Sequence, residues 1–119
     1  MIEKKLARGG IDRVIVYTVS FSDNYIAFTC DGHAHGGKRD AEGYNLVCAV
    51  VSAIAQTCAA GCEKYADFYK ETAWEGGRLG FICRKDEQTE AIMRTALIGL
   101  DEAARQYPEQ VRRGEIDGT

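Results

Sequence analysis

Apolar residues near the start of the chain follow patterns that are typical of strands. Residues 13–21 (RVIVYTVSF) and 25–31 (YIAFTCD) are rich in β-branched and aromatic side chains, which favour extended structure. Residues 22–24 (SDN) between them are common in turns. The two segments therefore predict a β-hairpin.

A different pattern follows at residues 46–62, an apolar run with almost no polar positions. Asn45 is a suitable N-cap, so we expect a helix to follow it. A helix without a polar face must be covered on more than one side, by a sheet and by a second helix or a partner subunit. The run has 17 residues, fewer than the roughly 20 that span a bilayer, and it contains Ser52 and Gln56. We interpret it as a buried helix and expect no membrane association.

The second half of the chain repeats this order. Residues 65–71 and 77–84 predict two strands joined by a turn around residues 75–77. Residues 89–107 have apolar side chains at helical spacing, and Pro108 helps to end that helix. The order β-β-α-β-β-α indicates an α+β fold with an antiparallel sheet of about four strands and two main helices.

Length and composition limit the domain organisation and the class of partner. The chain has 119 residues, enough for a single domain over residues 1–119, of which we expect 1–12 and 109–119 to be loosely ordered. The formal net charge is −3, which argues against nucleic-acid binding because no cationic surplus is available to displace counterions. Five cysteines cannot all pair, and the charged N-terminus has no apolar segment typical of a signal peptide. We therefore expect a cytoplasmic protein.

Candidate chemistry is concentrated around Cys48 and the only two histidines, His33 and His35. If Asn45 is the N-cap, Cys48 is the third helical residue, near unpaired amides and the positive end of the helix dipole. Such surroundings can lower the pKa of a cysteine from about 8.5 to roughly 3.5–7.5. A histidine at the end of the preceding strand could deprotonate the thiol and later protonate a leaving amine. This pattern is typical of nucleophilic catalysis by cysteine.

Two other interpretations of these residues remain open at this point. A cysteine in an apolar helix is most often a small core residue, and we assign this role to the other four: Cys30, Cys58, Cys62 and Cys83. A zinc site would use Cys30, His33, His35 and Cys48, whose sulfur and imidazole groups zinc prefers. In an extended strand, however, the two histidines point to one face and Cys30 to the other. We therefore expect neither a metal ion nor a cofactor.

Two linked motifs carry a resemblance to a known family. Gly32-His33-Ala34 precedes a glycine-containing segment, and residues 47–53 (VCAVVSA) open the first helix. In this order the chain resembles the ribosomal-processing cysteine proteases, Prp. The resemblance implies an α+β homodimer that removes the N-terminal extension of large-subunit ribosomal protein twenty-seven. It also implies His33 as the general base and Cys48 as the nucleophile, with Ser52 as the family serine one helical turn later.

The chain also departs from the family pattern. The family usually has an aspartate three residues before the cysteine, and this chain has Asn45, which carries no negative charge. The segment between His33 and Cys48 is a few residues longer than in the family, and His35 is additional. These departures leave an alternative function open: a non-catalytic dimeric module on the same fold that binds peptides or associates with the ribosome.

Overall fold

The computed structural model describes residues 14–32, 42–75 and 78–115. The elements are β1 (Ile15–Phe21), β2 (Tyr25–Asp31), α2 (Glu42–Tyr65), β3 (Tyr69–Glu75), β4 (Arg78–Arg84), α3 (Glu87–Gln106) and β5 (Val111–Arg113). The predicted order β-β-α-β-β-α is confirmed, and β5 is added after it. The predictions for residues 1–12 lie outside the described residues.

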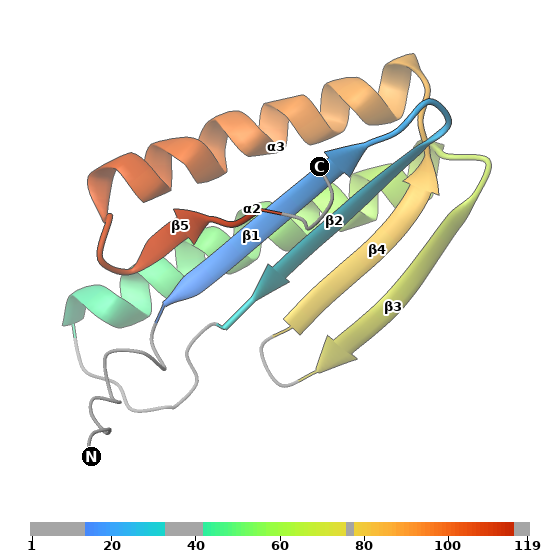
Figure 1. The fold of residues 1–119 in the computed structure, drawn as a ribbon. Helices are drawn as coiled ribbons and strands as arrows, with labels where there is room; N and C mark the ends of the chain where they lie inside the picture. The colour runs from blue at the N-terminus through green and yellow to red at the C-terminus, as the bar shows by residue number, and fades with distance from the viewer. Residues whose placement is uncertain (1–13, 33–41, 76–77, 116–119) are drawn as a thin grey trace.

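The strands form a single sheet in the order β3-β4-β2-β1-β5, and both helices pack on the same face of it (Figure 1). Four strands pair antiparallel, and β5 pairs parallel with β1. The sheet is therefore mixed and has five strands, whereas an antiparallel sheet of about four strands was predicted. The fifth strand lies within residues 109–119, which were expected to be loosely ordered.

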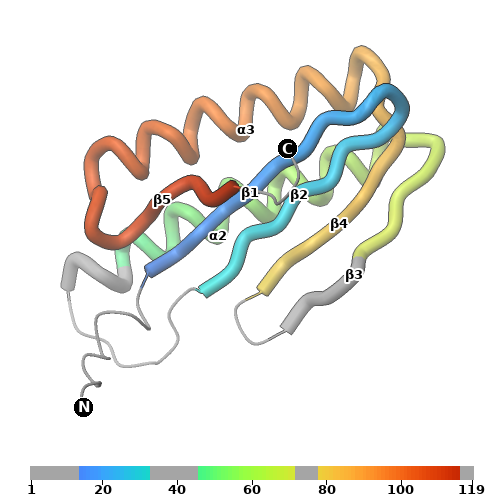
Figure 2. The backbone as a smooth tube through the Cα atoms, viewed as in Figure 1, coloured from blue at the N-terminus to red at the C-terminus, as the bar shows by residue number. Residues whose placement is uncertain are grey.

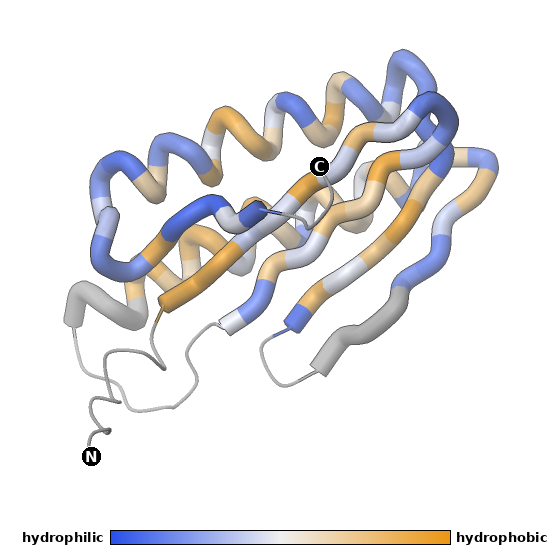
Figure 3. Tube along the Cα trace, in the orientation of Figure 1, coloured by the Kyte–Doolittle hydropathy of each residue, from blue (hydrophilic) through white to orange (hydrophobic). Residues whose placement is uncertain are grey.

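Alternate residues of the central strands face the helices and form the core. Tyr17, Phe28 and Phe81 are fully or almost fully buried, and the rings of Phe28 and Phe81 lie 5.6 Å apart. On α3, hydrophobic and hydrophilic positions alternate along the backbone (Figure 3), and its apolar face includes Met93 and Leu100 in the core. Burial of such a continuous apolar layer is the main stabilising contribution to the fold.

The first helix is longer than predicted at both ends. It begins at Glu42, so Asn45 is its fourth residue and not its N-cap, and that prediction was wrong. At the other end the helix continues to Tyr65, and the amide of Ala66 still donates to the carbonyl of Cys62 over 2.9 Å. The third strand consequently starts at Tyr69, four residues later than predicted.

The composition of α2 is apolar enough to raise the question of a membrane. Over Leu46–Tyr65 the helix could cross a bilayer by length and composition alone, a test that core helices of soluble proteins also pass. One face of α2 packs into the core through Val47, Val51 and Ala55, among others. Leu46 and Val50 on its outer side are exposed.

The short strand β5 lies beside the first half of β1 and follows the C-terminal end of α3 (Figure 2). The amide of Ile15 donates to the carbonyl of Gln110 over 2.8 Å, and the amide of Gly114 donates to the carbonyl of Tyr17 over 2.8 Å. These hydrogen bonds fasten the C-terminal segment to the strand that borders β2.

Candidate active site

The chain leaves β2 through a glycine that no other residue can replace without strain. Gly32 has φ +98°, a conformation that side chains rarely adopt. A Cβ atom at this position would lie only 2.5 Å from the carbonyl oxygen of Val14. The backbone between β2 and the histidine motif is therefore held closely against the start of β1. His33 and His35, which follow, lie outside the described residues.

Cys48 lies at the same end of the molecule, in the second turn of α2. In Figure 1 the N-terminal end of α2 and the C-terminal end of β2 are on one side of the fold. The half-buried Cys48 packs against the core cluster that includes Cys30, the penultimate residue of β2. The two thiols are near enough to interact electrostatically, which contributes to a raised pKa of Cys30. Cys30 is buried, as predicted, and its proximity to Cys48 is a feature that only the alternative zinc site had implied.

The surroundings of Cys48 differ from those predicted. Burial raises the pKa of its thiol, whereas a hydrogen bond with the side chain of Ser52 lowers it. Cys48 is the seventh residue of the helix and not the third. The helix dipole and the unpaired amides act mainly within the first turn, so both effects on Cys48 are weaker than expected. For the same reason its own amide is not available to bind an oxyanion.

Charged groups on the neighbouring strands border this end of the sheet. Asp31 is paired in register with Arg78 at the start of β4, and their side chains form an ion pair of 3.7 Å. Both side chains are about half exposed, so the pair contributes little to stability. The pair places one negative and one positive side chain at the end of β2 and the start of β4.

The three remaining cysteines form a separate cluster in the core. Cys58, Cys62 and Cys83 are at most 2% exposed, which confirms their assignment as core residues. Cys62 hydrogen-bonds with both Cys58 and Cys83, and the thiol of Cys58 lies 4.0 Å from the sulfur of Met93. Within the described ranges, no group of three or more potential ligands is arranged to hold a metal ion. The histidines of the alternative zinc site are outside these ranges, so that interpretation is untested.

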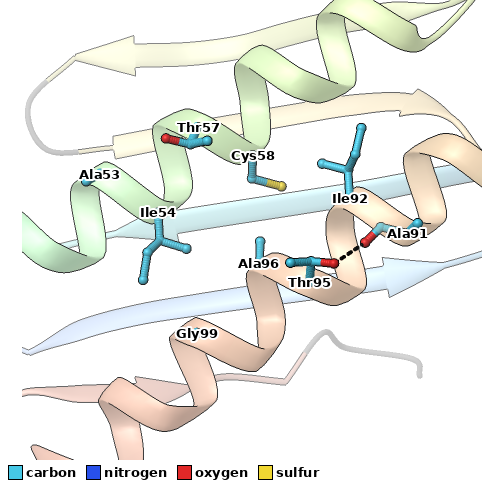
Figure 4. A pocket seen from close by; sticks show the side chains of 9 residues that line it. All are labelled: Ala53, Ile54, Thr57, Cys58, Ala91, Ile92, Thr95, Ala96 and Gly99. Atoms are coloured by element: carbon cyan, nitrogen blue, oxygen red, sulfur yellow. Dashed lines mark hydrogen bonds between the residues drawn. The ribbon is translucent and has the colours of Figure 1, made fainter.

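A groove of about 560 Å³ lies between the two helices (Figure 4), and Cys48 is not one of the residues that line it. Its walls are apolar, and Figure 4 shows Ile54 on α2 and Ile92 on α3 beside it. The hydroxyl of Thr95 donates to the carbonyl of Ala91 over 2.8 Å, so this polar group is satisfied within its own helix. Besides two threonine hydroxyls, the lining residues contribute the buried thiol of Cys58, and we do not assign the reaction to this groove.

The comparisons with known proteins identify the family of the chain. An α+β fold with a half-buried cysteine near a glycine-enforced bend is compatible with a cysteine protease. The model of the family "Cysteine protease Prp" matches residues 13–112, and the chain therefore belongs to this family of cysteine proteases. No curated protein matches the chain.

Solved structures show the same fold. The ribosomal processing protease Prp from S. aureus, in complex with a substrate peptide, is 19% identical with a TM-score of 0.66. The alignment covers 87% of this chain and 100% of that one. The same protease with a covalently linked product peptide is 21% identical with a TM-score of 0.65 and the same coverage. SMU.848 from Streptococcus mutans is 21% identical with a TM-score of 0.60, covering 90% of this chain and 97% of that one.

Proposed function

We propose that this chain is an endopeptidase that removes the N-terminal extension of large-subunit ribosomal protein twenty-seven, with Cys48 as the nucleophile and His33 as the general base. The observation that carries this proposal is the position of Cys48 beside the end of β2, where Gly32 forces a bend immediately before His33. Cys48 on α2 and the end of β2, two segments that are separated in the sequence, thus lie at one end of the fold, and His33 follows the end of β2 in the sequence.

The proposed reaction has two steps. His33 removes the proton of the Cys48 thiol, and the sulfur attacks the carbonyl carbon of the scissile peptide bond. As the tetrahedral intermediate collapses, His33 returns the proton to the leaving amine and a thioester remains on Cys48. Water, deprotonated by His33, then hydrolyses the thioester and regenerates the thiol.

Neighbouring residues support these steps in different ways. The hydrogen bond with Ser52 lowers the pKa of Cys48 and so opposes the effect of burial. Gly32 sets the path of the backbone toward His33. We assign no capping role to Asn45, because the helix begins three residues before it.

The class of substrate is supported by the relatives, whereas the choice of ribosomal protein twenty-seven follows from the motif resemblance. The S. aureus protein in the comparison is a ribosomal processing protease bound to a substrate peptide. We extend this activity to the present chain because it belongs to the same family. A synthetic peptide that spans the extension and the first mature residues of the ribosomal protein is the appropriate substrate.

The decisive experiment compares three variants on this peptide by mass spectrometry. We expect Cys48→Ala and His33→Ala each to lose cleavage by at least about 10³-fold, because each removes a reacting group. Cys58→Ala, a matched control in the same helix, should retain it. Undiminished cleavage by the Cys48→Ala variant would refute the assignment of the nucleophile.

A second candidate function is a non-catalytic peptide-binding or ribosome-associated module. The raised pKa of Cys48 favours it, because burial reduces the population of the reactive thiolate. The presence of Asn45 in place of the family aspartate also favours the non-catalytic module. Fluorescence anisotropy with a labelled peptide separates the two functions: the module would bind the peptide and release it intact, whereas the protease would release two fragments.

We also propose that the chain forms homodimers in the cytoplasm. The outer side of the helical layer supports a dimer, because Leu46 and Ile98 are 62% and 71% exposed and the apolar groove lies on the same layer. Light scattering at micromolar concentration tests the oligomeric state, and a stable monomer would contradict it. Cell fractionation tests the compartment, and recovery in the membrane fraction would contradict it.

A further inference from the structure

A polar network connects three elements at the end of the molecule that carries Cys48. The hydroxyl of Tyr17 on β1 donates a hydrogen bond to one carboxylate oxygen of Asp101 on α3. The other oxygen of Asp101 lies 3.4 Å from the guanidinium of Arg113 on β5. One carboxylate therefore joins the sheet, the second helix and the C-terminal strand.

Tyr17 is the buried residue of this network. Tyr17 has no exposed surface, and its hydroxyl finds a charged acceptor inside the protein. Burial and the Asp101 carboxylate both raise the pKa of Tyr17, so the hydroxyl remains a donor over the whole physiological range. A buried hydroxyl that lost this acceptor would be left unsatisfied in the protein interior, which is unfavourable. The hydrogen bond therefore favours a single arrangement of β1 and α3.

The network also borders the end of β2. Tyr17 is the direct cross-strand partner of Cys30, and opposite residues of antiparallel strands project to the same face. Cys30 in turn lies near Cys48. The start of β1 is fastened by the hydrogen bond from Ile15 to Gln110, the residue before β5, and it also borders Gly32, where a Cβ atom would lie 2.5 Å from the carbonyl oxygen of Val14.

We propose that Tyr17, Asp101 and Arg113 are positioning residues that hold the end of β2 in place opposite Cys48. They act through two packed strands and have no part in the bond changes. The consequence for catalysis rests on the proposed function, because it requires that the end of β2 carries the catalytic histidine. A displacement of about 1 Å can cost as much as 10²-fold in rate, so small shifts of this strand would be measurable.

The experiment uses the full chain with four substitutions in the network and one matched control. Tyr17→Phe removes only the hydroxyl, Asp101→Asn removes the charge, and Arg113→Ala removes the partner on β5. Arg113→Lys keeps the positive charge and should rescue the effect of the alanine variant. Glu102→Gln is the control, because Glu102 is the next residue on α3 and forms its ion pair with Arg105 outside the network.

Two measurements are made on each variant. Amide hydrogen exchange compares residues 29–31, at the end of β2, with residues 25–27 at its start. Cleavage of the ribosomal-protein peptide gives kcat and KM separately. We expect Tyr17→Phe and Asp101→Asn to accelerate exchange at residues 29–31 by about tenfold with little change at 25–27, and to lower kcat by about tenfold with KM within about twofold.

The two measurements test the further inference and the proposed function separately. Equal acceleration of exchange at both ends of β2 would show that the network has only a general structural role, and it would overturn the inference. An unchanged kcat in the network variants would also overturn it. If the unaltered chain cleaves no peptide, the proposed function fails by that result. Hydrogen exchange in the network variants then still decides whether the network holds the end of β2. Unchanged protection at residues 29–31 would overturn the further inference.

Discussion

The two halves of α2 place the same side chain in contrasting surroundings. Cys48, in the second turn, is half-buried and hydrogen-bonds with Ser52. Farther along the helix, Cys58 and Cys62 are 2% and 0% exposed and hydrogen-bond with each other. The difference shows that a cysteine in this helix becomes a candidate nucleophile through access and neighbours, since its sequence surroundings are apolar in both halves.

The largest expected difference between the two halves is in thiol reactivity. Iodoacetamide should modify Cys48 at least about 100-fold faster than Cys58, Cys62 or Cys83, because the buried thiols react only after local opening of the core. Mass spectrometry with fragmentation assigns the modified positions, and Cys48→Ala should lose the fast phase. Equal rates for Cys48 and Cys58 would remove the contrast between the two halves.

The next contrast concerns two glycines, one at the end of the fold that carries Cys48 and one between the helices. Gly32→Ala should destabilise the fold by about 1–3 kcal/mol, because it combines a positive φ with a Cβ atom 2.5 Å from the Val14 carbonyl oxygen. It should also lower peptide cleavage. Urea unfolding and a cleavage assay measure the two effects.

Gly61→Ala is the matched control for this substitution. A Cβ atom at Gly61 would lie 3.4 Å from the side chain of Ile92, a contact that a flexible group can accommodate. Because alanine is the better helix former, we expect a change between neutral and about 1 kcal/mol of stabilisation. A Gly32→Ala variant as stable as Gly61→Ala would contradict the structural constraint on Gly32.

The smallest effect is a change in the pH dependence of stability. Burial, followed by the Asp31 carboxylate and Cys48, raises the pKa of Cys30 from an ordinary value near 9 to about 12. A raised pKa contributes stability that is fully present below about pH 9 and is lost as the pH rises toward 12. The slope for one such group is at most about 1.4 kcal/mol per pH unit.

Cys30→Ala should therefore flatten the loss of stability above pH 9, as measured by urea unfolding between pH 8 and pH 10.5. Val51→Ala is the control, because it removes buried volume without a titrating group and should lower stability equally at each pH. Parallel pH profiles for the unaltered chain and the Cys30→Ala variant would contradict a buried Cys30 with a raised pKa.

Much of the fold was predictable from local patterns. Alternation and β-branched residues located β2 at its observed bounds and β1 to within two residues. Helical spacing located α3, whose start at Glu87 is set by Asp86, an N-cap that accepts from the amide of Thr89 over 2.9 Å. The strand β5 was missed because three residues with two arginines have no strand pattern, and β5 exists only through its pairing with β1.

The candidate site was predictable only in part. The motifs at Gly32 and Cys48 were visible in the sequence, and the positive φ of Gly32 explains why the first of them needs glycine. The position of Asn45 was predicted wrongly, because capping residues are also tolerated inside helices. The raised pKa of Cys48 depends on burial by residues distant in the sequence, so no local motif could indicate it.

The sequence by itself determined the family and the order of the elements from β1 to α3, because these depend on local periodicity and on motifs that are contiguous along the chain. Only the tertiary structure decided that Cys30 lies near Cys48, that Cys62 meets Cys58 and Cys83 in the core, and that Asp101 joins Tyr17 to Arg113. These relations arise when distant segments pack against one sheet and exclude water between them. The reactivity of each cysteine follows from that packing.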